Sequence, residues 1–371
     1  MSNEYSETKT ISVTKASSGC CLGTILGMIL FFSSFVVLFW NESRIDFSNV
    51  ARNAIEININ SQNNNAISKL VYASGQINSE QTLGDDLFLN PAPYIAVNRK
   101  VEMYAWNETV RTNTYKKSDG TKVTEKIYKY NKEWQNNPDN SASFQIPSGH
   151  ENPPEKAIPD GNFQVEKAKI GLYSLDLSDL RLPDINKWQK IPLNQQNFKL
   201  SPDIIIANQY LYKGNVNNPQ VGDLRIQYAA LFNNTNVTGF GELAENYRII
   251  PYFYRNKHKF YQLFVGDKKG AIADLRNEYT IFLWMFRVVG FLMMWIGLAS
   301  SVGTITNLFS FIPFVGDLID NFIGNATFIL ALILTSITII ISILLNNIIA
   351  IMATIMVALA VITTLRKLRR N

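Results

Sequence analysis

The sequence is poor in the side chains that most often carry redox and metal chemistry. Its 371 residues include two cysteines and two histidines. Cys20 and Cys21 are adjacent, so the chain that follows them has no cysteine with which to form a disulfide. The two histidines, His150 and His258, are too few for a typical zinc site. We therefore expect no metal and no cofactor, and a fold held together by an ordinary hydrophobic core.

Charge of either sign is absent from long stretches of the chain. Residues 20–40 form an uncharged run of 21 residues, close to the roughly 20 that cross about 30 Å of hydrocarbon. The run ends in bulky Phe39 and Trp40 and not at a small-residue cleavage site. We interpret it as a transmembrane helix and not as a removed signal peptide. A second apolar run covers residues 288–306.

The longest uncharged run, residues 323–365, has 43 residues. As one helix it would be about 64 Å long, twice the hydrocarbon thickness. We expect it to fold back at Asn346 and Asn347, the polar pair near its middle. The four predicted spans are residues 20–40, 288–306, 322–345 and 348–365.

Positive charge sets the predicted orientation. Residues 366–371 read RKLRRN directly after the last span, and positive residues that flank spans stay cytoplasmic. With four spans, residues 1–19 are a second cytoplasmic tail, and residues 41–267 form a lumenal or periplasmic domain. The net charge is +5, with no dense basic patch outside the C-terminus, so nucleic acid is not an expected partner.

Two segments beside the spans are apolar without being clear spans themselves. Residues 268–287 are expected to form an interfacial amphipathic helix, with Arg287 at the lipid headgroups. The alternative is that Arg287 lies inside a longer span, where a charge would suggest a functional site. Residues 307–321 connect two spans on the cytoplasmic side and are expected to be interfacial or re-entrant, with Asp317 and Asp320 toward water.

The extracytoplasmic segment is rich in predicted strands. Residues 97–106 alternate between apolar and polar side chains, as a half-buried strand does. Residues 110–116 and 121–130 flank an Asp-Gly pair that favours a hairpin turn. Helical spacing occurs only in residues 172–188, where we expect one or two short helices. Further strands are expected at residues 224–232, 236–241 and 259–266. The predicted fold class is a multi-pass α-helical membrane protein with four spans and a large β-rich (α+β) lumenal domain.

His150 and Glu151 form the pattern that most resembles an acid–base site. A carboxylate can orient an imidazole for catalysis, but adjacent residues of an extended segment point in opposite directions. Glu151 is therefore poorly placed to orient His150, and no nucleophile or metal motif accompanies the pair. We expect no catalytic residue, and we interpret His150 as a loop residue whose imidazole hydrogen-bonds backbone groups.

Two further patterns allow a functional and a structural interpretation. Asp85 and Asp86 could bind a hard cation, but a Gly-Asp-Asp turn before an apolar strand is the favoured interpretation. Gly297 and Ser301, with Gly290 nearby, give the second span a small-residue face. Such a face permits close contact between helices, either within one chain or between copies.

Eight segments in a fixed order resemble the LUMA family, also called the transmembrane protein 43 family. The segments are LFWNESR, KLVYASGQI, NRKVEMYAWNET, EWQNNPDNSASFQIPSGHENP, IGLYSLDLSDL, VGDLRIQYAAL, FLWMFRVVGF and IPFVGDL, from Leu38 to Leu318. The resemblance implies one N-terminal span, a large lumenal domain and three C-terminal spans. Two departures are Ser43, where the family usually has glycine, and Asn346-Asn347, where an aromatic-Arg-Pro turn is common.

The resemblance also implies a function. Animal members of the family are proteins of the inner nuclear membrane and endoplasmic reticulum that self-associate and help organise complexes with emerin and lamins; bacterial members exist as well. We therefore expect a self-associating scaffold without chemistry of its own, in an endoplasmic reticulum, nuclear-envelope or bacterial inner membrane. Its expected partners are the lipid bilayer, further copies and other membrane proteins. Two rival functions are an enzyme with a site near His150 and a transporter, for which Arg287, Asn325 and Asn346-Asn347 are the strongly polar candidates in the spans.

Overall fold

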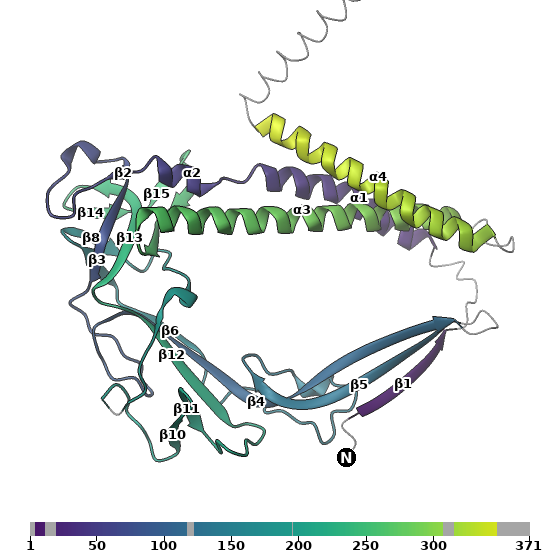
Figure 1. Cartoon of the computed structure of the whole chain (residues 1–371), viewed down its shortest axis with the longest axis horizontal. Helices are drawn as coiled ribbons and strands as arrows, with labels where there is room; N and C mark the ends of the chain where they lie inside the picture. Colours follow the sequence, from purple (N-terminus) through teal and green to yellow (C-terminus); the bar gives the residue numbers. More distant parts are fainter. Residues whose placement is uncertain (1–3, 12–19, 117–121, 195, 307–314, 347–371) are drawn as a thin grey trace, which may run out of the picture. The chain divides into compact units, whose positions relative to one another are not determined.

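The structure, a computed structural model, describes residues 4–11, 20–116, 122–194, 196–306 and 315–346. The chain divides into two compact units, whose elements are labelled in Figure 1. The β unit consists of Met1–Val13 and Asn49–Ala273, and the helical unit consists of Thr14–Ser48 and Asp274–Asn371.

The bounds of the elements are as follows. The helices are α1 (Cys20–Glu42), α2 (Phe47–Arg52), α3 (Lys268–Thr306) and α4 (Val315–Asn346), with short 3-10 helices at Asn64–Ala66, Ser141–Ser143 and Ile185–Lys187. The strands are β1 (Glu4–Ile11), β2 (Ile55–Glu56), β3 (Leu70–Asn78), β4 (Tyr94–Lys116), β5 (Lys122–Gln135), β6 (Gly161–Gln164), β7 (Lys167–Ile170), β8 (Tyr173–Asp176), β9 (Gln189–Lys190), β10 (Ile204–Ala207), β11 (Tyr210–Lys213), β12 (Leu224–Phe232), β13 (Thr235–Ala244), β14 (Arg248–Ile250), β15 (Tyr252–Tyr254), β16 (His258–Phe260) and β17 (Gln262–Val265).

The β unit contains two large sheets. Sheet A has the strand order β1-β5-β4-β12-β11-β10, with β6 on β4 and β9 on β12. Sheet B has the order β17-β13-β14-β8-β7-β3-β2, with β13 also paired to β3. The long β4 joins most of sheet A, because it pairs antiparallel with β5 along one part and with β12 along another. A separate pair, β15 and β16, precedes β17.

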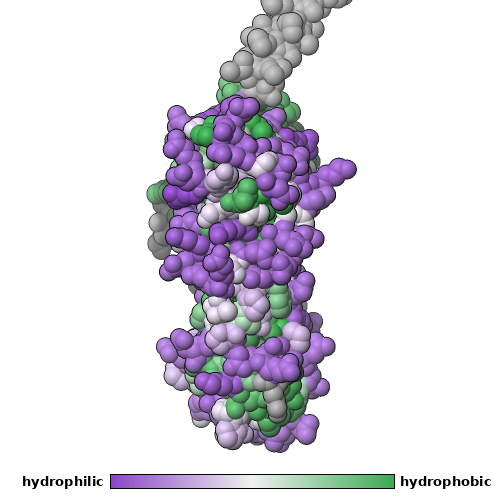
Figure 2. Space-filling model, turned by 90° about the vertical axis from the view of Figure 1, so that its left-hand side faces the viewer, coloured by the Kyte–Doolittle hydropathy of each residue, from purple (hydrophilic) through white to green (hydrophobic). Residues whose placement is uncertain are grey.

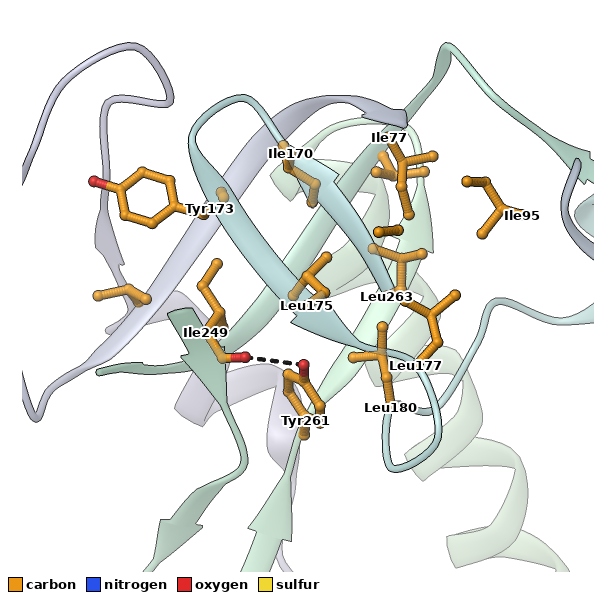
Figure 3. Close-up of a cluster of buried hydrophobic side chains, with 14 of the residues drawn as sticks. Ile77, Ile95, Ile170, Tyr173, Leu175, Leu177, Leu180, Ile249, Tyr261 and Leu263 are labelled. Atoms are coloured by element: carbon orange, nitrogen blue, oxygen red, sulfur yellow. Dashed lines mark hydrogen bonds between the residues drawn. The ribbon is translucent and has the colours of Figure 1, made fainter. Parts of the chain in front are cut away.

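Alternation between buried and exposed side chains places the core of the β unit. On β4, Val97, Val101, Met103 and Ala105 are all buried, which confirms the predicted inward face of that strand. A second cluster of buried side chains lies mostly on sheet B and its loops, with members from β4 and β12 of sheet A, and Leu175, Leu177 and Leu263 gather there with their neighbours (Figure 3). The hydroxyl of one of its tyrosines, Tyr261, donates to the Ile249 carbonyl oxygen at 2.9 Å. Its other large members include Ile77, Ile95, Ile170, Tyr173, Leu180 and Ile249.

Most predicted strands are present, and one predicted helical region is not. The strands expected at residues 224–232 and 236–241 correspond to β12 and β13. The prediction for residues 172–188 is wrong in its first part, because Tyr173–Asp176 is strand β8 and only Ile185–Lys187 is helical. Tyr173, Leu175 and Leu177 follow a period of two: all three are buried, and Asp176 between the two leucines is exposed.

The N-terminal segment holds an element that the sequence analysis did not expect. Glu4–Ile11 forms strand β1, which pairs antiparallel with β5 from Glu4 opposite Lys129 to Ile11 opposite Lys122. Strand β1 therefore forms one edge of sheet A, and β10 forms the other.

Within the part of the chain that the structure describes, three helices are long and apolar enough to cross a membrane by length and composition: Gly23–Arg52, Lys268–Ser301 and Asn325–Asn346. α3 covers both the predicted interfacial helix and the predicted second span, so the structure has one continuous helix where the sequence analysis expected two. α4 begins at Val315, seven residues before the predicted span at 322. The predicted span at 348–365 lies outside the described residues.

The surfaces of the two units differ in character. The face seen in Figure 2 is predominantly hydrophilic, with scattered hydrophobic patches, as expected of a domain in water. The helices α1, α3 and α4 instead carry many exposed large apolar side chains, among them Phe32, Val36, Ile281, Ile329 and Ile340. Helices that are apolar on their outer surface are suited to contact with lipid.

Candidate functional sites

His150 is packed between aromatic rings in the loop that follows β5. Its side chain stacks on Tyr130 with ring centroids 3.9 Å apart, and it meets the Trp106 ring edge-on at 4.7 Å. The residue is buried, and Nδ1 lies 3.0 Å from the carbonyl oxygen of Ile146. This backbone contact confirms the predicted environment of the imidazole.

The rings around His150 are themselves held by hydrogen bonds. The Tyr130 hydroxyl donates to Glu108 Oε2 at 2.7 Å and accepts from the Ile146 N–H at 3.0 Å. The same Glu108 oxygen accepts from the Gln145 N–H at 2.6 Å. Burial and the neighbouring Glu108 carboxylate raise the pKa of Tyr130 to about 12. These bonds attach the loop that contains His150 to the β4–β5 hairpin.

Glu151 does not share the environment of His150. It is exposed, and its carboxylate accepts a hydrogen bond from the Gly149 N–H at 2.9 Å, which holds the pKa of Glu151 below its usual value. The second histidine, His258, is exposed on β16. The structure therefore does not bring the two histidines into one buried cluster, and His150 is bonded as a packing residue of the hairpin.

Asp85 is a buried carboxylate in the loop between β3 and β4, bonded to two neighbouring strands of sheet A. Its Oδ2 accepts from Arg99 Nη1 on β4 and from the Tyr228 hydroxyl on β12, each at 2.5 Å. Its Oδ1 accepts from the N–H groups of Leu87, Phe88 and Leu89, at 3.1, 2.7 and 2.7 Å. Asp85 thus organises its own turn and attaches it to two strands, which agrees with the turn that the sequence favoured over a cation site.

The electrostatics of Asp85 follow from these contacts. Burial alone would raise the pKa of a carboxyl, but the hydrogen bonds from Tyr228, from the backbone and from Arg99 outweigh it and hold the pKa of Asp85 below the usual 3.8. Arg99 is anchored in turn by a bond from Nε to the Pro159 carbonyl oxygen at 3.1 Å. This triad was not predicted, because Tyr228 is 143 residues from Asp85 in the chain and no local pattern links them.

A second ionic cluster lies where α1 ends and α3 passes it in the helical unit. Arg287 donates through Nε and Nη2 to the two oxygens of Glu42, at 2.7 and 2.9 Å. Asn41 Nδ2 donates to the Leu283 carbonyl oxygen at 2.9 Å, and Arg276 pairs with Asp46. Arg287 is therefore part of a two-point ion pair between α1 and α3, a role that the sequence analysis did not foresee.

The small-residue face of α3 contacts α1 within the same chain. A Cβ atom added to Gly297 would lie 2.6 Å from the backbone N of Phe31, and one added to Gly290 would lie 2.6 Å from Leu38 Cδ2. On the other helix, a Cβ at Gly27 would lie 2.9 Å from Ser300 Cβ. Of the two alternatives left open by the sequence, the intramolecular contact is the one present in the structure.

In the helical unit, α1 and α3 approach closely at glycines. In the β unit, the buried Arg99 is paired with Asp85. A model of the family described as Transmembrane protein 43 matches residues 103–348 of this chain. The chain belongs to the transmembrane protein 43 family. The match includes the β4–β5 hairpin, the His150 loop, α3 and α4, and it confirms the family that the eight segments indicated.

Curated members of the transmembrane protein 43 family align over most of this chain. Transmembrane protein 43 of Rattus norvegicus is 25% identical over 334 residues, which are 85% of this chain and 82% of the rat protein. The Homo sapiens protein is 24% identical over 335 residues, with the same coverage. The Drosophila melanogaster homolog is 25% identical over 309 residues, or 78% of this chain and 79% of that protein. No solved structure matches. The family and the apolar helices together establish an integral membrane protein.

Proposed function

We propose that this protein is a membrane scaffold: the helical unit anchors it in the bilayer, and the β unit associates with further copies and with other membrane proteins. The proposal assigns no catalytic chemistry to the chain. The observation that carries it is the outer edge of sheet A at β10. An unpaired strand edge is a template for pairing with another chain.

β10 has the features of an edge that can accept a further strand. It pairs on one side with β11, from Ile204 opposite Lys213 to Ala207 opposite Tyr210. Ile205 is 50% exposed and Ile206 is 37% exposed. β-branched residues favour strands, and apolar ones gain from burial, whereas soluble proteins usually protect an edge with charge.

A pocket beside this edge adds to its capacity for binding. The pocket has a volume of about 300 Å³, and Ile206 lines it together with Ile191, Leu193 and Tyr228. A side chain from an added strand can enter such a depression while its backbone pairs with β10.

A second copy is the simplest occupant of the edge. Two β10 strands can pair antiparallel about a two-fold axis, which brings the same surface of each copy into contact and closes the assembly. Each Ile205 would then lose water contact, contributing about 1.5–3 kcal/mol for a fully buried isoleucine. In a membrane, helices α1, α3 and α4 would hold both copies in one plane and so favour the encounter.

Crosslinking in native membranes tests the scaffold. We expect an amine-reactive crosslinker to give dimers and larger species of the wild-type chain, with other membrane proteins captured in the larger bands. Ile205→Glu adds a charge to the edge and no reactive amine, so the self-crosslinked species should fall to a small fraction. Leu172→Glu is the matched control, because Leu172 is 49% exposed in a turn away from β10. Only monomers, with no captured partner, would rule out the scaffold.

A further inference from the structure

Arg44 lies two residues beyond the end of α1, against a group of aromatic rings. Its guanidinium carbon lies 5.4 Å from the centroid of the Phe282 ring and 5.8 Å from that of Trp40. The rings of Tyr279 and Phe286 are each 5.9 Å away. A cation beside four rings is held by the attraction of the ring quadrupoles, and among the residues that the structure describes no carboxylate pairs with Arg44.

The carboxylates nearest to Arg44 in the sequence are bonded to other arginines. Glu42 accepts two hydrogen bonds from Arg287, and Asp46 pairs with Arg276. Arg44 Nη1 is buried and has no hydrogen-bond partner among the residues that the structure describes. This cluster of two carboxylates and three arginines therefore has a net charge of +1, and the residue without a carboxylate is Arg44.

The position of Arg44 in the chain corresponds to the level of lipid headgroups. The uncharged run of α1 ends at Trp40, and Phe39 and Trp40 are 43% and 51% exposed. Aromatic side chains of this kind gather where hydrocarbon meets water, and arginine reaches the headgroup region from a helix end. A lipid phosphate at this depth, just outside the hydrocarbon core, would lie beside Arg44.

We propose that Arg44 binds the phosphate of a phospholipid in the leaflet at the C-terminal end of α1. Because Nη1 is buried, the donors that would meet two phosphate oxygens are the paired N–H groups on the Nε and Nη2 edge of the guanidinium, and the rings fix its orientation before the lipid arrives. The acyl chains of that lipid would lie along the exposed rings of Phe39 and Phe282. The recognised group is a phosphate diester, and lipids without phosphate should not compete.

Native mass spectrometry of the full-length protein tests the site. Detergent-solubilised protein is titrated with phosphatidylglycerol, with galactosyl diacylglycerol, which lacks phosphate, and with inorganic phosphate. We expect the wild type to retain one phosphatidylglycerol in preference to the galactolipid. Arg44→Gln should weaken this retention about tenfold, as expected for loss of charge-assisted hydrogen bonds. Arg111→Gln, at an exposed position on β4, makes the same charge change and should leave retention unchanged.

Each outcome decides the proposal. Equal retention of the phospholipid and the galactolipid by the wild type would overturn it without any variant, so a poorly folded Arg44→Gln protein does not block the test. Displacement of the lipid by millimolar inorganic phosphate would overturn the assignment to a lipid headgroup. An unchanged Arg44→Gln protein would exclude Arg44. The site does not depend on β10, so Ile205→Glu should keep the lipid even where it abolishes crosslinking.

Discussion

At the scale of single residues, His150 illustrates how a rare and reactive side chain can serve packing. The ring is buried, stacks on Tyr130 and lies 3.0 Å from a backbone carbonyl through Nδ1. We expect His150→Ala to lower the free energy of unfolding by about 2 kcal/mol, through the lost stacking, the lost hydrogen bond and the cavity left behind. Denaturant unfolding of the detergent-solubilised protein measures this change.

The other histidine of the chain provides a matched control. His258 is exposed on β16, so His258→Ala should change the free energy of unfolding by less than about 0.5 kcal/mol. An equally stable His150→Ala protein would contradict the packing role and would reopen the question of an acid–base function at this loop.

The lowered pKa of Asp85 predicts that the free energy of unfolding falls in strongly acidic solution. Its folded-state pKa lies below the 3.8 of the unfolded chain, so the carboxylate stabilises the fold above that value, and this contribution is lost as the pH falls through the folded-state pKa. Asp85→Asn should cost about 3 kcal/mol at neutral pH, because it leaves the buried Arg99 without its anion.

The difference between the wild type and Asp85→Asn isolates this residue from other titrating carboxylates. We expect the difference in unfolding free energy to be constant from about pH 5 to pH 7 and to shrink in strongly acidic solution. A difference that does not change with pH would mean that Asp85 has the same pKa in the folded and the unfolded protein, and would contradict the stabilising role of its carboxylate.

Sequence reasoning identified the turn at Asp85 but not its partners. A Gly-Asp-Asp pattern is local, and the turn followed from it. Arg99 and Tyr228 reach Asp85 only because β4 and β12 are neighbours in sheet A, which no local pattern in one chain reveals. The same holds for Glu42 and Arg287, which are 245 residues apart in the chain.

At the scale of elements, the contact between α1 and α3 depends on glycine. We expect Gly297→Ala to destabilise the helical unit by about 1–3 kcal/mol, because the new Cβ would lie 2.6 Å from the Phe31 backbone and the helices must separate. Gly23→Ala on α1 is the control, since a Cβ there has nothing within 4 Å. It should be neutral or should stabilise α1 slightly, as alanine in place of glycine does in a helix.

Thermal unfolding of the two variants in the same detergent compares them directly. A lower midpoint temperature of unfolding for Gly297→Ala, but not for Gly23→Ala, would support the close contact between α1 and α3. Equal midpoints for Gly297→Ala and the wild type would mean that α1 and α3 do not approach closely in the protein in solution.

Element types were predictable where one local signal dominated. The alternation of apolar and polar side chains predicted the inward face of β4, and the length of the uncharged run predicted α1. The prediction for residues 172–188 was wrong because the leucines fit a helical spacing, whereas Tyr173, Leu175 and Leu177 fit a period of two. Pairing with β7 and β14 selects the strand. The continuity of α3 was missed because Arg287 was treated as a boundary, whereas its bonds to Glu42 satisfy the charge within the helix pair.

At the scale of the whole molecule, the N-terminal tail raises a choice between two arrangements. Pairing of β1 with β5 requires the tail and the β unit to share one compartment, whereas a membrane-spanning α1 separates them. Among the side chains of α1 that the structure describes, eight large apolar ones are exposed, and each gains about 1.5–3 kcal/mol from full burial. The eight residues of β1 gain about 0.5–1.5 kcal/mol per hydrogen bond, which the cost of ordering each residue, about 1–2 kcal/mol, largely cancels.

We therefore expect α1 to span the bilayer, with the tail and the β unit in opposite compartments. In a chain with Cys20→Ala and Cys21→Ala, a single cysteine placed by Ser6→Cys reports on the tail, and one placed by Thr112→Cys reports on β4. We expect a membrane-impermeant maleimide to label only one of the two in sealed vesicles, and both after permeabilisation. Labelling of both in sealed vesicles of one orientation would mean that α1 does not cross and that β1 remains in sheet A. With α1 spanning, the edge of β5 that β1 covers becomes a second free edge of sheet A, available to a strand from another protein on the side of the β unit.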